Sequence, residues 1–269
     1  MLGQLIFVGL GLSSERSISL QGLDLAKEAD CIFAEFYTSP MPHLDFGKLE
    51  RLVGKPIQIL RRSDVEEYAQ HAVLERIRDR KAVFLVPGDP MVATTHIDLR
   101  LRAEKAGVKT RVIAGASILS AIGGLTGLQA YKFGRTVTIP YVEGKLPESP
   151  YDHIKTNLQA DLHTLALLDV AAERSYYMSI REGLEYIQQI ELRRRDPVIG
   201  GRGLVVGIAK AGADDAVVKA GTVGELVSLN FGGPPHCLII PANLHFMEAE
   251  ALEILAGADP RTVKRLVSR

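Results

Sequence analysis

An aspartate held in a turn of prolines and glycine is the clearest place in this sequence where a reactive side chain has a fixed position. Asp89 lies within Val86-Pro87-Gly88-Asp89-Pro90, directly after the apolar run Ala82–Leu85. The prolines fix φ and lack an N–H, and the glycine tolerates positive φ, so a buried strand ends here in an irregular turn. Ligands bind beyond the carboxyl ends of strands in open α/β sheets, which predicts that Asp89 lies in a ligand loop. A solvated aspartate in a Pro-Gly turn explains the same residues equally well.

Three further turns follow apolar runs and have residues that allow close approach of a ligand. Gly9-Leu10-Gly11 follows a first strand, Ala114–Ser117 follows another, and Gly232–Pro235 precedes His236. The first turn has two glycines where a dinucleotide-binding fingerprint needs three, and no helix begins directly after it. Either a backbone approach to a ligand or a tight turn without one explains these glycines.

The elements that must position these turns alternate between strand and helix in the first half of the chain. We expect strands at 4–8, 31–37, 57–60, 82–86 and 111–113, and helices at 20–29, 63–80 and 96–106. Ser63 and Glu66 have the spacing of a capping box for the second helix. Alternation of this kind predicts an α/β fold with a doubly wound parallel sheet.

The second half of the chain predicts another α/β lobe with a mixed sheet. Strands are expected at 136–140, 164–169, 204–209 and 237–240, and helices at 178–193, 222–229, 245–256 and in the basic tail 261–269. The Pro- and Gly-rich segment 140–150 is interpreted as a connection. The domain prediction is an N-terminal lobe of residues 1–113 and a C-terminal lobe of residues 114–269.

Composition limits the partners that this chain can have. Its 269 residues suit two domains, and 32 basic residues balance 32 acidic ones, so no global field favours nucleic acid or anionic membrane. Cys31 and Cys237 lie in apolar runs, which predicts buried thiols and neither disulfides nor a metal site. No apolar run approaches membrane-spanning length, and we expect a cytoplasmic protein.

Several of these segments together resemble the diphthine synthases, which form part of the tetrapyrrole methylase group of S-adenosylmethionine-dependent methyltransferases. The resemblance covers nearly the whole chain. The Gly-Asp-Pro turn is typical of the wider group, whereas Ala93-Thr94-Thr95-His96 and Tyr131-Lys132-Phe133-Gly134 are similar to the diphthine synthases specifically. The remaining matching segments are Gly9–Leu12, Phe33–Ser39 and Pro234–His236. One difference is Leu12, where the wider group often has proline.

The resemblance implies two α/β lobes, a homodimer and S-adenosylmethionine folded into a cleft between the lobes. The family's cofactor contacts correspond to Leu10, Asp89, Val92, Ser117, Ile118, Leu168, Ala211 and His236. The apolar members of this set suit adenine and ribose, and Asp89 suits a ribose hydroxyl or the methionine ammonium. Taken alone, His236 would be interpreted as a satisfied loop histidine and Leu168 as a core residue.

The reaction that the resemblance implies is methylation of an amine on a modified histidine of translation elongation factor 2, in diphthamide biosynthesis. The amine must lose a proton before it attacks. Glu35, His96 and Asp169 are candidate bases, but a structural role suits each equally well, so the catalytic residue stays unassigned. Lys132 and Arg135 are candidates for contact with the protein substrate, with solvated surface charge as the alternative.

Other functions remain open at this point. One alternative is that the chain is another member of the same group, which methylates a tetrapyrrole or a ribosomal RNA. The neutral net charge argues against RNA. A nucleotide-binding regulator or an NAD oxidoreductase would use a similar glycine loop, but the third glycine and the expected acidic residue are missing.

Overall fold

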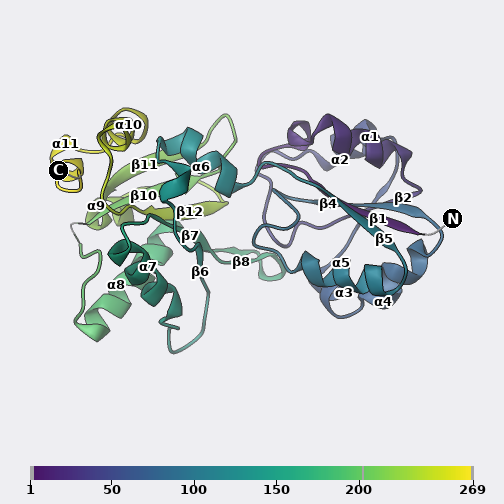
Figure 1. Cartoon of the computed structure of the whole chain (residues 1–269), viewed down its shortest axis with the longest axis horizontal. Helices are drawn as coiled ribbons and strands as arrows, with labels where there is room; N and C mark the ends of the chain where they lie inside the picture. Colours follow the sequence, from purple (N-terminus) through teal and green to yellow (C-terminus); the bar gives the residue numbers. More distant parts are fainter. Residues whose placement is uncertain (1–2, 202, 268–269) are drawn as a thin grey trace. The chain divides into compact units, whose positions relative to one another are not determined.

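The computed structural model describes residues 3–201 and 203–267, which form two compact units (Figure 1). Unit 1 contains residues 1–118 and 172–174, and unit 2 contains residues 119–171 and 175–269. Each unit has its own sheet and its own hydrophobic core.

Unit 1 is built on a five-stranded sheet in which every strand is parallel to its neighbours, in the order β3-β2-β4-β1-β5. The strands are β1 Gln4–Gly9, β2 Cys31–Ala34, β3 Ile57–Ile59, β4 Lys81–Val86 and β5 Lys109–Ile113. Parallel strands are buried on both faces, which explains why β1 and β4 are almost continuous apolar runs. The predicted doubly wound sheet is confirmed.

Helices cover both faces of this sheet (Figure 1). One face carries α1 Leu20–Glu28 and α2 Phe46–Val53, and the other carries α3 Arg62–Glu66, α4 Ala69–Ala72, the 3₁₀ helix η2 Leu74–Ile77 and α5 His96–Lys105. A short 3₁₀ helix, η1 Glu15–Ser17, follows β1. Helix α2 was not predicted from the sequence, although Asp45 caps its first turn and Gly54 ends it in the left-handed region.

The prediction of one continuous helix over 63–80 is wrong. The segment consists of α3, α4 and η2, because the backbone leaves helical geometry at Tyr68 and Val73. The capping box predicted for Ser63 and Glu66 is wrong, because α3 already begins at Arg62, and its start is held by the Asp64 carboxylate, which accepts a hydrogen bond from the Arg61 N–H at 2.9 Å. The breaks let apolar residues from all three short helices reach the same core, namely Val65, Ala69, Val73, Leu74 and Ile77.

Unit 2 has a five-stranded mixed sheet in the order β11-β10-β12-β7-β6. The strands are β6 Val137–Ile139, β7 Thr164–Leu168, β10 Leu204–Ala209, β11 Val217–Thr222 and β12 His236–Ile240. Only β6 and β7 are parallel, and the other neighbours are antiparallel. The mixed sheet predicted for the second lobe is confirmed, whereas β11 was missed because an edge strand that is half exposed has a weak apolar pattern.

The helices of unit 2 lie on both sides of its sheet, with α7 and α8 on one side and α6 and α10 on the other (Figure 1). Their bounds are α6 Ile118–Thr126, η3 Ala130–Lys132, α7 Ser149–Gln159, α8 Ile180–Arg194, α9 Val223–Ser228, α10 Phe246–Ala256 and α11 Pro260–Val263. Helix α7 begins inside the segment interpreted as a connection, because proline is accepted in a first helical turn. The helix predicted in the basic tail 261–269 is only the short α11, which is followed by a turn at 264–266. Of that tail, Ser268 and Arg269 lie outside the described residues.

A small hairpin follows β7 along the chain. It consists of β8 Val170–Ala171 and β9 Tyr176–Tyr177, joined by the 3₁₀ helix η4 Ala172–Arg174. The strands β8 and β9 belong to unit 2, whereas the three residues of η4 belong to unit 1, where Ala172 packs against the core. Among the described residues, no helix has the length and apolar character to cross a membrane.

Candidate cofactor site at the strand ends

Three glycines from three different turns meet where β1, β4 and β5 end. A Cβ on Gly9 would lie 2.5 Å from the Gly115 backbone and 2.6 Å from the Gly88 carbonyl oxygen, and a Cβ on Gly115 would lie 2.1 Å from that same oxygen. Gly11 and Gly88 also exchange two backbone hydrogen bonds, at 3.2 and 2.8 Å. These glycines therefore let the turns pack on one another, which accounts for the close approach that the sequence left open.

Asp89 is fixed by this arrangement. Its Oδ2 accepts a hydrogen bond from the Gly115 N–H at 3.1 Å, and its Oδ1 accepts one from the Met91 N–H at 2.9 Å. Each carboxylate oxygen can accept a second bond, so the half-buried side chain retains capacity for a ligand. Gly88 has φ 66° and Ala93 has φ 55°, which places a strained non-glycine residue in the same loop.

The other residues predicted in unit 1 lie at the same edge of the sheet. Leu10 directly follows β1, is fully buried, and its N–H bonds the Val86 carbonyl at 2.8 Å. Val92 lies three residues beyond Asp89, and Ser117 and Ile118 follow β5 at the start of α6. Because β4, β1 and β5 are adjacent and parallel, the structure brings these five predicted residues to one edge of one sheet.

The three residues predicted in unit 2 also share one sheet edge. Leu168 ends β7, Ala211 follows β10, and His236 begins β12, which lies between those two strands and runs antiparallel to both. His236 pairs with Ala209 in the sheet register. The backbone at Lys210, beside Ala211, has φ 52°, so this edge also contains a strained residue.

His236 has an unusual environment for a histidine. Both ring nitrogens are shielded from solvent, and neither has a partner at hydrogen-bond distance and angle among the described residues. Burial lowers the pKa of the ring, although nearby backbone groups at Gly232, Met178 and Gly233 oppose that effect. A buried nitrogen without a partner costs free energy, and a bound ligand that supplies one would recover it. A cavity of about 320 Å³ beside His236 is also lined by residues of α8 and of the loop 229–232.

A second polar cluster lies in unit 1 beside the Gly-Asp-Pro turn, and its Glu35, Tyr37 and His96 are buried while Thr38 is half-buried. Glu35 accepts hydrogen bonds from the N–H groups of Tyr37 and Thr38 at 2.9 and 3.0 Å, and from the Thr38 hydroxyl at 2.6 Å. The Tyr37 hydroxyl lies 3.2 Å from Nε2 of His96, and the Glu35 carboxylate lies 3.8 Å from the same nitrogen. Nδ1 of His96 lies 3.2 Å from the Pro90 carbonyl oxygen.

Burial dominates the ionisation of this cluster. It raises the pKa of Glu35 to about 7, against the hydrogen bonds from Thr38 and Tyr37, and it lowers the pKa of His96 to about 4. The pKa of Tyr37 is also raised, first by burial and then by the charge of Glu35. At pH 7 the His96 ring is therefore neutral.

The three candidate bases have different surroundings. Glu35 and His96 have no exposed surface, so neither can meet a protein substrate directly in this structure. Asp169 is half-buried, and its two oxygens accept hydrogen bonds from the N–H groups of Tyr141 and Val170, both at 2.8 Å. The structure therefore does not single out one of them as the base, and the catalytic residue stays unassigned.

Lys132 and Arg135, the candidates for substrate contact, also differ. The Lys132 ammonium bonds the buried Glu248 carboxylate at 2.9 Å and the Asn243 carbonyl at 2.6 Å. Arg135 has an exposed side chain and bonds Asn157 only through its backbone. Lys132 thus has a structural role, which neither substrate contact nor a solvated surface charge describes.

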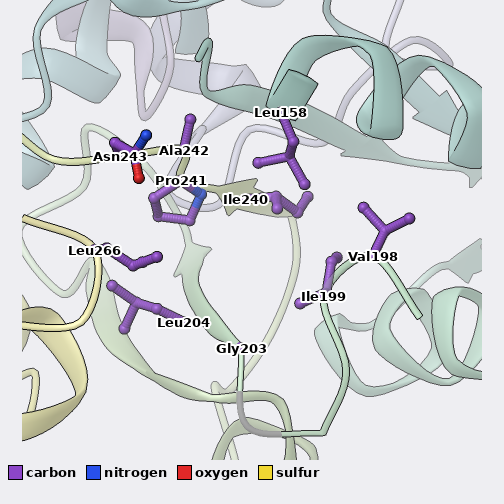
Figure 2. A pocket seen from close by; sticks show the side chains of 10 residues that line it. All are labelled: Leu158, Val198, Ile199, Gly203, Leu204, Ile240, Pro241, Ala242, Asn243 and Leu266. Atoms are coloured by element: carbon purple, nitrogen blue, oxygen red, sulfur yellow. The ribbon is translucent and has the colours of Figure 1, made fainter. Parts of the chain in front are cut away.

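A cavity of about 230 Å³ opens at the opposite edge of the unit 2 sheet, where β10 begins and β12 ends (Figure 2). Most of its lining is aliphatic, with Leu158, Ile240, Leu204 and Leu266 among the side chains (Figure 2). Of the described residues that line it, none is charged and none is one of the eight predicted contacts.

Comparison with known proteins identifies the family of this chain. The tetrapyrrole (corrin/porphyrin) methylase family matches residues 4–227. A diphthine synthase from Methanocella arvoryzae is 48% identical over 255 residues, which are 94% of this chain and 98% of that protein. A diphthine synthase from Methanosarcina mazei is 48% identical over 268 residues, or 97% of this chain and 99% of that protein.

Solved structures give the same result. A crystal structure of diphthine synthase is 40% identical, covers 98% of this chain and 100% of its own, and superposes with a TM-score of 0.87. These matches confirm the predicted fold class, the function of diphthine synthase and the use of S-adenosylmethionine as methyl donor. The chain belongs to the tetrapyrrole methylase family.

Proposed function

We propose that this enzyme methylates the amine of the aminocarboxypropyl-modified histidine of translation elongation factor 2, in the cytoplasm and as a homodimer. The convergence of predicted contacts at the strand ends carries the proposal: five meet at one edge of the unit 1 sheet and three at one edge of the unit 2 sheet. The proposed functional division is still an N-terminal lobe of residues 1–113 and a C-terminal lobe of residues 114–269; the compact units differ from it because residues 114–118, with Ser117 and Ile118, belong to unit 1.

The proposed contacts fit the chemistry of S-adenosylmethionine. Leu10, Val92, Ile118, Leu168 and Ala211 would face its adenine and ribose, with Ser117 beside them. Asp89 has lone pairs left for a ribose hydroxyl or the ammonium, and His236 has two nitrogens that lack partners among the described residues. The donor supplies a methyl group already activated by the positive sulfur, so these residues need only orient the reactants and exclude water.

Calorimetry with S-adenosylhomocysteine tests the proposed contacts. Asp89→Asn keeps the size of the side chain and one oxygen, and should weaken binding about tenfold, since a hydrogen bond to a charged group contributes about 1.5 to 3 kcal/mol. Asp98→Asn is a matched control, because Asp98 is exposed on α5 and pairs with Arg102 only on the helix surface. Equal affinities of the two variants would remove Asp89 from the site.

The homodimer is supported by a helix that is apolar on two sides. Helix α10 buries Ala249, Leu252 and Ala256 in its own unit, yet Met247, Ile254 and Leu255 are 54%, 72% and 52% exposed. An exposed apolar stripe of this kind is typical of an interface. Light scattering of Ile254→Glu should show a monomer where the wild type shows a dimer, and a monomeric wild type would contradict the proposal.

A further inference from the structure

The Pro90 carbonyl is the point where the buried cluster of unit 1 reaches the proposed cofactor loop. Pro90 directly follows Asp89. Its carbonyl accepts two side-chain hydrogen bonds, one from the Thr94 hydroxyl at 2.6 Å and one from Nδ1 of His96 at 3.2 Å. The other side of the turn is held by Gly115, whose N–H bonds Asp89. The turn is therefore fixed from two sides.

The geometry determines which nitrogen of His96 carries the proton. The Pro90 carbonyl can only accept, so Nδ1 is the N–H donor in that bond. In a neutral ring Nε2 is then the acceptor, and the Tyr37 hydroxyl donates to it at 3.2 Å. Burial keeps the His96 ring neutral at pH 7. The hydrogen bonds thus run in one direction, from the Tyr37 hydroxyl through His96 to Pro90.

Tyr37 is itself held in place. Its N–H bonds Glu35, and the Arg62 guanidinium lies 4.9 Å from the centre of its ring. Arg62 also pairs with Glu66 at 3.3 Å and with Glu173 at 3.6 Å, all within unit 1. The hydrogen bonds from Tyr37 through His96 to Pro90 form a bridge between the loop after β2 and the loop after β4. These two strands are neighbours in the sheet.

We propose that Tyr37 and His96 are positioning residues for the cofactor, because they hold the Pro87–Pro90 turn, and with it Asp89, in binding geometry through the Pro90 carbonyl. This inference rests on the proposed role of Asp89. Neither residue touches the cofactor, since His96 has no exposed surface and Tyr37 is buried. Loss of the bridge should raise the KM for S-adenosylmethionine and leave kcat at saturation nearly unchanged.

The test uses a pair of buried histidines. His96→Leu removes the donor to Pro90, and His96→Asn restores one, because the asparagine amide nitrogen occupies nearly the position of Nδ1. His163→Leu is the matched control: His163 is also fully buried, bonds Glu248 at 3.0 Å and the Ala242 N–H at 2.9 Å, and precedes β7 at the end away from Leu168. Affinity for S-adenosylhomocysteine is measured by calorimetry and stability by urea unfolding.

We expect His96→Leu to weaken binding about tenfold and His96→Asn to return it to within about threefold of the wild type, as one buried hydrogen bond predicts. His163→Leu should destabilise the protein comparably and leave affinity within about twofold. Equal affinities of the two leucine variants, or no rescue by asparagine, would overturn the inference. A wild type that fails to bind S-adenosylhomocysteine would instead overturn the proposed function.

Tyr37→Phe keeps the ring and decides the question even if His96→Leu does not fold. It removes only the hydroxyl that donates to Nε2 and should weaken cofactor binding about threefold. Tyr186→Phe is its control, because the Tyr186 hydroxyl bonds the Pro147 carbonyl in unit 2. An affinity of Tyr37→Phe equal to that of Tyr186→Phe would contradict the proposal.

Discussion

Each unit buries a glutamate beside a histidine, but the two pairs have different partners. In unit 2, Glu248 accepts hydrogen bonds from Lys132 at 2.9 Å, from His163 at 3.0 Å, and from the N–H groups of Gln129 and His245 at 2.8 and 2.9 Å. In unit 1, Glu35 accepts hydrogen bonds from Tyr37 and Thr38, and within the described part of the chain none comes from a cation. Both carboxyl groups have no exposed surface.

The difference appears in the direction of each pKa shift. Burial opposes the ionisation of both carboxyl groups, but the hydrogen bonds to Glu248 outweigh it and lower its pKa to about 2. For Glu35, burial prevails and raises the pKa to about 7. Both pKa values are thus strongly displaced from 4.5, in opposite directions, so the geometry and not the size of the shift distinguishes the clusters. Glu248 joins Lys132 to His163 within unit 2, and removing one partner of such a buried ion pair destabilises a fold. Glu35 lies beside His96, which bonds the Pro90 carbonyl of the Gly-Asp-Pro turn.

Glu248→Gln should have the largest effect on stability. It removes the charge that pairs with Lys132, whose side chain is only 17% exposed, and so leaves a cation partly buried without its partner. We expect the free energy of unfolding to fall by about 4 kcal/mol at pH 7, measured by urea titration. Cofactor affinity should not change. A loss below about 1 kcal/mol would mean that the two glutamates do not differ as proposed.

Glu35→Gln should change the pH dependence of stability. The folded pKa of Glu35 is raised above its ordinary value of 4.5, so its contribution is fully present below that pH and is lost as pH rises through about 7. The wild type should therefore lose about 3 kcal/mol relative to Glu35→Gln between about pH 4.5 and 8. For Glu248 the sign is opposite, because its contribution is lost as pH falls from 4.5 through about 2. Parallel pH curves for the wild type and Glu35→Gln would contradict the raised pKa.

Glu173→Gln should have the smallest effect. Its ion pair with Arg62 is 3.6 Å long, and both side chains are more than two-fifths exposed. We expect unfolding to change by less than about 1 kcal/mol, since exposed ion pairs contribute little. Arg62 would still lie over the Tyr37 ring. A larger loss would show that Glu173 contributes more to the unit 1 cluster than its ion pair with Arg62 indicates.

The sequence was sufficient to predict the sheet of unit 1, because parallel strands buried on both faces form apolar runs such as Ile6–Val8 and Ala82–Val86 that few other structures require. It was insufficient for 62–77, where apolar residues have helical spacing but the chain breaks twice to pack them. Propensity and periodicity describe neighbours in sequence, and the breaks depend on the core.

The candidate site was predictable to a similar extent. The turns at Gly9, Gly88 and Ser117 follow recognisable strands, so their convergence at one sheet edge follows from parallel topology. Glu35 and His96 were considered only as separate residues, because 61 positions in sequence separate them and no spacing rule joins them. The contacts that Glu35 and Tyr37 make with His96 depend on β2 and β4 being neighbours in the sheet.

Mass spectrometry of elongation factor 2 tests the central claim most directly. The factor carrying the aminocarboxypropyl-modified histidine is incubated with this enzyme and S-adenosylmethionine. We predict that the peptide containing that histidine gains the mass of one or more methyl groups, and that the gain needs both enzyme and cofactor. No gain on that peptide, together with methylation of a tetrapyrrole under the same conditions, would contradict the account.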